Sequence, residues 1–194
     1  TEGDIVCLPG LLPLEACAMA LTAAMESSLK SILNTKNDDR DRARSAGDPH
    51  GSARVHGLRA VDYLRHRRPD LVEGRYQWGA AWLLSQTGCN RQVPHCDFDC
   101  VKVKEHCEHQ GAVSPATFWV SLQDGGLLYI KNRGTWHKLH CRAGDAVVFK
   151  GEHCGAEHCG EDPHYRLHMY LDAIKLCWPG QSPGQVHVDG SLVA

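Results

Sequence analysis

From residue 75 onwards the chain is built from short runs rich in β-branched and aromatic residues, punctuated by Gly, Asn and Asp. The part before it is dominated by helix-forming residues. The strands predicted from these runs are 76–86, 92–99, 117–123, 127–131, 146–150 and 166–174. Helices followed by many short strands favour an antiparallel sandwich or barrel with helices packed on one side. We therefore expect an α+β fold of this kind.

The N-terminal part predicts one strand and two helices. Residues 4–9 are short and apolar and lead into a turn, as a strand would. Over 14–34, apolar residues recur at three- and four-residue steps, which is typical of an amphipathic helix. A polar stretch over 34–52 predicts a long loop or lid, and 55–67 predict a second, shorter helix.

Length and composition predict one globular domain over 1–194, with a hydrophobic content of 42% that allows a real core. The N-terminal strand and helices would occupy 1–70 and the core of strands about 75–175. The Gly/Pro/Ser-rich tail, 178–194, is expected to be irregular. No apolar run approaches the roughly 20 residues of a membrane span, so no membrane partner is expected.

Charge and cysteine content restrict the environment of the protein. A net charge of −2 argues against an obvious polyanion binder. Lys and Arg concentrate over 30–68, but Asp residues lie among them, which favours a mixed-charge solvated surface over a nucleic-acid-facing patch. Ten Cys in a chain long enough to bury a core favour reduced thiols in an intracellular protein, cytoplasmic or nuclear, over a disulfide scaffold.

The segment His95-Cys96-Asp97 is the main candidate for chemistry. Residues two apart on a strand point to one face, so the imidazole and the carboxylate converge. One neutral nitrogen and one anionic oxygen suit a divalent iron that must keep coordination positions open. This short motif arises often by chance, so it needs a second histidine from a later strand.

That second histidine has two candidates. His153 directly follows the predicted strand 146–150, and His158 comes five residues later. We favour His153 because it lies closer to the strand end and is followed by small residues. Arg166 begins the last predicted strand, and a planar guanidinium binds a carboxylate through two hydrogen bonds. A structural ion pair is the alternative role for Arg166, and His168 is expected to pack or hydrogen-bond on the same face rather than to bind metal.

These motifs together resemble the double-stranded β-helix of Fe(II)/2-oxoglutarate dioxygenases, in the group that includes prolyl 4-hydroxylase-like enzymes. LLSQTGCNRQVPHCDFD resembles the strand entering the metal-binding turn, and VSLQDGGLLYI the middle strands. AGDAVVFKGEHCGA resembles the strand and turn of the distal histidine, and YRLHMYLD the strand of the co-substrate arginine. DIVCLPGLLPLEAC is also similar to the N-terminus of that group. The resemblance implies a jelly-roll or cupin-like core with N-terminal helices on one side.

The resemblance also implies a chemistry and a set of site residues. His95, Asp97 and His153 would hold Fe(II), and Arg166 would bind the distal carboxylate of 2-oxoglutarate. Enzymes of this family use O2 to convert 2-oxoglutarate into succinate and CO2 while they hydroxylate a C–H bond. Further residues expected from their strand position to line the co-substrate pocket are Tyr76, Trp78 and Leu84.

Substrate and function are less defined. The prolyl-hydroxylase-like order of the motifs favours a protein or peptide side chain as the substrate, with specificity in loops 34–55 and 100–115. One alternative is oxidation or demethylation of a nucleic-acid base, although no sequence feature reads a base. Another is a non-catalytic, cupin-like metal-binding protein, which would have no need for Arg166.

A cluster of cysteines and histidines near the two metal motifs is not explained by the resemblance. Its members are Cys100, His106, Cys107, His109, Cys154, His158 and Cys159. Four of them could bind a structural Zn²⁺ tetrahedrally, in which case His158 would be a zinc ligand. A disulfide between the two loops and free thiols are the alternatives.

Overall fold

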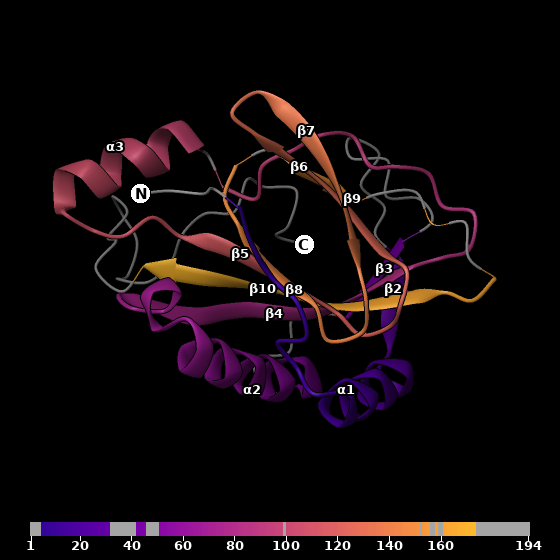
Figure 1. Ribbon diagram of the computed structural model, residues 1–194. Helices are drawn as coiled ribbons and strands as arrows, with labels where there is room; N and C mark the ends of the chain where they lie inside the picture. Colours follow the sequence, from indigo (N-terminus) through magenta and orange to yellow (C-terminus); the bar gives the residue numbers. More distant parts are fainter. Residues whose placement is uncertain are drawn as a thin grey trace.

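The computed structural model describes residues 5–31, 42–45, 51–98, 100–151, 153–155, 158 and 161–173. Within these ranges, a seven-stranded sheet lies opposite a three-stranded sheet, and two helices cover the outer face of the larger sheet (Figure 1). All paired strands are antiparallel. This arrangement confirms the expected α+β class with helices on one side.

The larger sheet is centred on two almost completely buried strands, β5 (Ala116–Ser121) and β10 (His164–Ala173). In spatial order its strands are β1 (Ile5–Leu8), β8 (Ala146–Phe149), β5, β10, β4 (Arg75–Ser85), β3 (Arg42–Ser45) and β2 (Leu29–Ser31). Because β10 lies in the middle of this sheet, neighbouring strands hold its side chains in place on both sides.

The smaller sheet has the order β7 (Thr135–Cys141), β6 (Gly126–Asn132) and β9 (His153–Gly155). An isolated bridge between His95 and His153 extends it by one further pairing. Apolar side chains between the two sheets join them into one interior, with Trp119 and Phe149 from the larger sheet against Ile130 from the smaller one.

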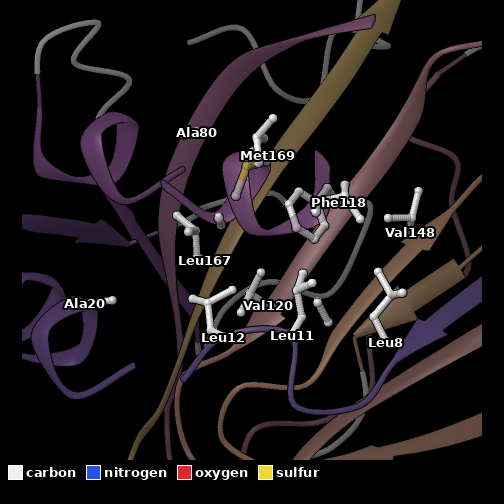
Figure 2. Packing of buried hydrophobic residues seen from close by; sticks show 14 of the residues in the cluster. Leu8, Leu11, Leu12, Ala20, Ala80, Phe118, Val120, Val148, Leu167 and Met169 are labelled. Atoms are coloured by element: carbon white, nitrogen blue, oxygen red, sulfur yellow. The ribbon is translucent and has the colours of Figure 1, made fainter. Parts of the chain in front are cut away.

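Helices α1 (Leu14–Glu26) and α2 (Ser52–Arg67) pack on the outer face of the larger sheet. Figure 2 shows the core beneath them, where Leu167 and Met169 of β10 lie beside Phe118 of β5. A short 3-10 helix, η2 (Pro69–Leu71), follows α2. No helix in the described part of the chain is long and apolar enough to cross a membrane.

The alternation of side chains along β10 separates this core from the other face of the sheet. Leu167, Met169 and Leu171 belong to the core under the helices. Arg166 and His168 therefore point to the opposite face, between the two sheets. The polar residues of β10 thus lie in the interior of the sandwich.

Four details of the predicted elements were wrong. The segment 92–99 was predicted as a strand, but 92–98 form no regular strand and meet β9 through the isolated His95–His153 bridge. The helix predicted over 14–34 ends at Glu26, because Ser27 is extended and 29–31 pair with β3 as strand β2. The stretch 100–115, expected to be a loop, contains helix α3 (Cys100–Gln110). Strand β7 was not predicted, because it lies mostly exposed and its sequence, TWHKLHC, lacks a hydrophobic run. Most of the predicted 34–52 loop lies outside the described residues.

Candidate metal site

The ligand atoms of His95, Asp97 and His153 converge at one point between the sheets, all within 4.8 Å of one another. His153 Nε2 lies 3.5 Å from Asp97 Oδ2. Asp97 and His153 are buried, and His95 is partly exposed. Among the described residues, this is the group of His, Cys, Asp and Glu side chains that could hold a metal ion.

The backbone brings the two histidines together. His95 and His153 exchange both of their N–H···O=C hydrogen bonds, each 2.9 Å long. In an antiparallel pair, residues directly opposite each other place their side chains on the same face. Their rings accordingly lie with centroids 4.6 Å apart. This bridge fixes the relative position of two side chains that come from distant parts of the sequence.

Hydrogen bonds to backbone carbonyls assign the tautomer of both histidines. His95 Nδ1 lies 2.9 Å from the carbonyl oxygen of Val93, and His153 Nδ1 lies 3.2 Å from that of Gly151. A carbonyl only accepts, so Nδ1 carries the proton and Nε2 of the neutral ring keeps its lone pair. Burial lowers the pKa of His153 to about 4, so this ring is neutral at pH 7.

Asp97 is held as a carboxylate in a buried position. Burial alone would raise the pKa of this carboxyl group. At the low pH where the group titrates, however, His153 is protonated, and its charge together with His168 and Thr117 holds that pKa well below its usual range. Thr117 Oγ1 donates a hydrogen bond of 2.6 Å to Asp97 Oδ2. His168 Nε2 lies 3.4 Å from the same oxygen.

The three residues fit a divalent cation. The lone pair of His153 Nε2 faces a negatively charged oxygen of Asp97, and two electron-rich atoms in a buried site repel each other unless a cation lies between them. Two neutral imidazole nitrogens and one carboxylate form the donor set of non-haem Fe(II) sites that keep open positions.

Arg166 lies on the same face of β10 as His168, two residues away. Its side chain is buried, and Nη1 donates a hydrogen bond of 2.6 Å to Ser85 Oγ on β4. The guanidinium stays charged at any physiological pH, so the interior between the sheets carries a fixed positive charge near the candidate metal site. Such a group suits the binding of a carboxylate.

Tyr76 and Trp78 also face the interior, but away from Arg166. Tyr76 donates a hydrogen bond of 3.1 Å to Asp172, and the ring of Trp78 lies 5.6 Å from that of Tyr170. Their partners follow His168 along β10, whereas Arg166 precedes it. The structure therefore places them beyond the metal-site residues, at the other end of this face.

Leu84 lies on the helix-covered face of the sheet, where it pairs with Tyr165. A β-bulge in β4 causes this: the register shifts between His168 and Tyr170, and Gly79, with φ +61°, supplies the extra residue. One additional residue reverses the alternation of side chains. Leu84 therefore lies on the opposite face from Tyr76 and Trp78, contrary to the expectation that all three line one pocket.

His158 lies apart from the three converging residues. Its Nε2 is 2.6 Å from the carbonyl oxygen of Asp162, and its ring centroid is 5.7 Å from that of His164. Of the two candidates for the distal histidine, His153 is the one beside His95 and Asp97.

The proposed zinc cluster is only partly within the described side chains. Cys107 is a free, buried thiol whose sulfur lies 3.6 Å from the carbonyl oxygen of Val113. The side chains of Cys100, Cys154 and Cys159 lie outside the described part. Zinc binding and a disulfide therefore both remain predictions.

Neither a role for Thr117 nor the contact of His168 with Asp97 was predicted from the sequence. The available signal was a pair of hydroxyl residues, Thr117 and Ser121, on an otherwise apolar buried strand. Strand alternation puts both on the same face as Trp119, which pairs with His168.

Comparison with known proteins defines the fold. No family model matches the sequence, and neither does any curated protein. The structure is similar to the non-haem α-ketoglutarate-dependent epimerase SnoN from nogalamycin biosynthesis, with a TM-score of 0.67 and 14% identity over 94% of this chain and 88% of that one. It is also similar to a Pseudomonas putida prolyl-4-hydroxylase, with a TM-score of 0.61 and 18% identity over 86% of this chain and 91% of that one. A third similar structure is HygX from Streptomyces hygroscopicus, solved with nickel and 2-oxoglutarate, with a TM-score of 0.64 and 11% identity over 94% of this chain and 93% of that one.

The chain thus has the fold of the Fe/2-oxoglutarate-dependent oxygenases, and the double-stranded β-helix core implied by the sequence resemblance is confirmed.

Proposed function

We propose that the protein is an Fe(II)- and 2-oxoglutarate-dependent oxygenase in which His95, Asp97 and His153 hold the metal and Arg166 binds the co-substrate. The observation that carries the proposal is the convergence of the three ligand atoms on the side of β10 that also bears Arg166. The fold it shares with SnoN and HygX supports the same enzyme class.

Each residue has a definite task. His95 and His153 present unprotonated Nε2 atoms, because their Nδ1 protons are engaged by backbone carbonyls. Asp97 supplies the negative charge that offsets part of the charge of the cation. When bound, Fe(II), 2-oxoglutarate and O2 supply the oxidising power for hydroxylation of a C–H bond.

Arg166 provides the charge for the distal carboxylate of 2-oxoglutarate. Its hydrogen bond to Ser85 fixes the guanidinium on the interior face. The buried position removes competing water, so the ion pair with a dicarboxylate is stronger than it would be at the surface. A metal-binding protein without turnover has no use for this residue.

We further propose that the substrate is a protein or peptide side chain, because one of the similar structures is a prolyl-4-hydroxylase. SnoN comes from nogalamycin biosynthesis, and HygX has been solved with hygromycin B bound, so both are associated with small molecules. A substrate screen should therefore include peptides and small molecules. The nucleic-acid alternative gains no support from the basic 30–68 region, where Arg65 pairs with Asp62 and Arg68 with Asp70 on the surface.

The proposal is tested by succinate formation from 2-oxoglutarate with Fe(II), ascorbate and O2, without added substrate. We expect slow release of succinate by the wild-type protein and none by Asp97→Ala, which keeps the surrounding strands but lacks the anionic ligand. Equal succinate release by both proteins would contradict the metal assignment.

A further inference from the structure

His168 has no place in the mechanism given so far, although it lies beside the carboxylate of Asp97. We propose that His168 is a positioning residue of the metal centre: it orients the Asp97 carboxylate for metal binding without itself being a ligand. This inference rests on the proposed function, because it concerns the same metal site.

Asp97 needs such orientation because it lies outside the regular strands of both sheets. Its carboxylate is buried and makes contacts with two neighbouring strands at once. Thr117 on β5 donates to Oδ2 at 2.6 Å, and His168 on β10 approaches the same oxygen at 3.4 Å. Two anchors on one oxygen restrict rotation of the carboxylate, which a single hydrogen bond would leave free.

The ring of His168 is itself well fixed. The residue lies on a central strand between Trp119 of β5 and Ala81 of β4. Its side chain is 13% exposed, and the ring of Tyr170 packs against it edge-on, with centroids 5.1 Å apart. Because the ring of His168 is held in one position by the sheet, its contact can hold the Asp97 carboxylate in one orientation.

The arrangement separates His168 from the ligands. The three ligand atoms lie within 4.8 Å of one another, and the group they form does not include His168. Nε2 of His168 approaches Asp97 Oδ2, the oxygen that accepts the Thr117 proton and also lies 3.5 Å from His153 Nε2. Partners of this kind, which orient a ligand from outside, typically change metal affinity by about 10- to 100-fold when removed.

The test measures Co(II) affinity of the full-length apo-protein by competition with a chelator, together with the absorption spectrum of bound Co(II). His168→Gln keeps an N–H donor at a similar reach, whereas His168→Leu keeps the bulk and removes the donor. We expect His168→Leu to weaken Co(II) binding by about 10- to 100-fold and His168→Gln to restore most of it. The exposed His140 on β7 provides the matched control, and His140→Leu is expected to bind Co(II) like the wild type.

Each result decides a separate question. Wild-type Co(II) affinity and spectrum in His168→Leu, even with a lowered melting temperature, would overturn the inference and leave His168 a packing residue. Weak binding by both variants, with a changed spectrum, would assign His168 to the ligands and also overturn it. Absence of Co(II) binding by the wild type would instead contradict the proposed function itself.

Discussion

Each candidate ligand histidine uses a carbonyl two residues before it to fix its tautomer. His95 Nδ1 donates a hydrogen bond to the carbonyl oxygen of Val93, and His153 Nδ1 donates one to that of Gly151. The same local geometry therefore occurs in two segments, 93–97 and 151–155, that share only the His-Cys pair. At both positions this hydrogen bond leaves the lone pair of Nε2 able to bind a cation, which is the chemical requirement for a metal ligand.

The role of Arg166 predicts the behaviour of the co-substrate. Replacement by Met keeps the bulk but removes charge-assisted hydrogen bonds worth about 1.5–3 kcal/mol each, so the KM for 2-oxoglutarate is expected to rise by about tenfold or more. Arg166→Lys should retain part of the affinity, because it keeps the charge but loses the fork of donors. Succinate assays over a range of 2-oxoglutarate concentrations measure both effects.

A matched control is Arg133→Met in the exposed β6–β7 turn, which should leave the KM unchanged. If Arg166→Met also leaves it unchanged, the co-substrate must bind elsewhere.

His164 predicts a pH dependence of stability. Burial and the nearby Arg166 lower the pKa of His164 from 6.5 to about 4. The unfolded chain therefore takes up a proton at higher pH than the folded protein, and the stability present above about pH 6.5 is lost as the pH falls toward 4. Between pH 7 and pH 5, this residue is expected to account for a loss of about 2 kcal/mol in the free energy of unfolding.

Urea unfolding of the metal-free protein at the two pH values measures this loss. His164→Gln should reduce it by about that amount, while His140→Gln, at an exposed position, should not. An identical loss in the wild type and His164→Gln would show that another group is responsible.

At the level of elements, the β-bulge of β4 decides which side chains reach the interior. Gly79 adopts φ +61°, and a Cβ placed there would come within 3.0 Å of the Tyr170 ring. Gly88 has a similar φ of +77° but has nothing within 4 Å of that position. A substitution at Gly88 therefore tests backbone strain alone, whereas one at Gly79 adds steric overlap with Tyr170.

Gly88→Ala is expected to cost about 1 kcal/mol, from the left-handed conformation alone. Gly79→Ala should cost about 1–3 kcal/mol more, because the ring of Tyr170 must move. Urea unfolding curves of the two variants give the comparison. Equal destabilisation would mean that the interior next to Tyr170 adapts freely to the added methyl group.

Elements with a strong local pattern could be predicted from the sequence, and those defined by distant partners could not. The apolar periodicity of α2 and the apolar runs of β5, β8 and β10 are local signals, and the predicted elements match. Strand β2 continues an apolar helical pattern and becomes a strand only because β3 pairs with it. The exposed strand β7 likewise exists through its pairing with β6.

At the scale of the whole molecule, the candidate site exists only when both sheets are assembled. His153 belongs to the smaller sheet, Arg166 and His168 to the larger one, and Asp97 to the segment between β4 and α3. A metal held by these segments ties the two sheets together. The site is therefore a property of the folded sandwich rather than of any one segment.

This dependence also explains which parts of the candidate site could be predicted from the sequence. The order of the motifs along the chain can be recognised without knowing the fold. That order identified four candidate residues: His95, Asp97, His153 and Arg166. The contact of Thr117 with Asp97 depends on how the segment between β4 and α3 packs against β5, and no local sequence pattern specifies that packing. The position of Leu84 depended on a single-residue bulge.

The most direct test of the account is calorimetric titration of 2-oxoglutarate into the apo-protein and into protein loaded with Ni(II), a metal found together with 2-oxoglutarate in HygX. We predict clear binding only in the presence of Ni(II), with loss of binding in both Asp97→Ala and Arg166→Met. Binding of equal strength with and without the metal, or in both variants, would contradict the claim that these residues form one site for metal and co-substrate.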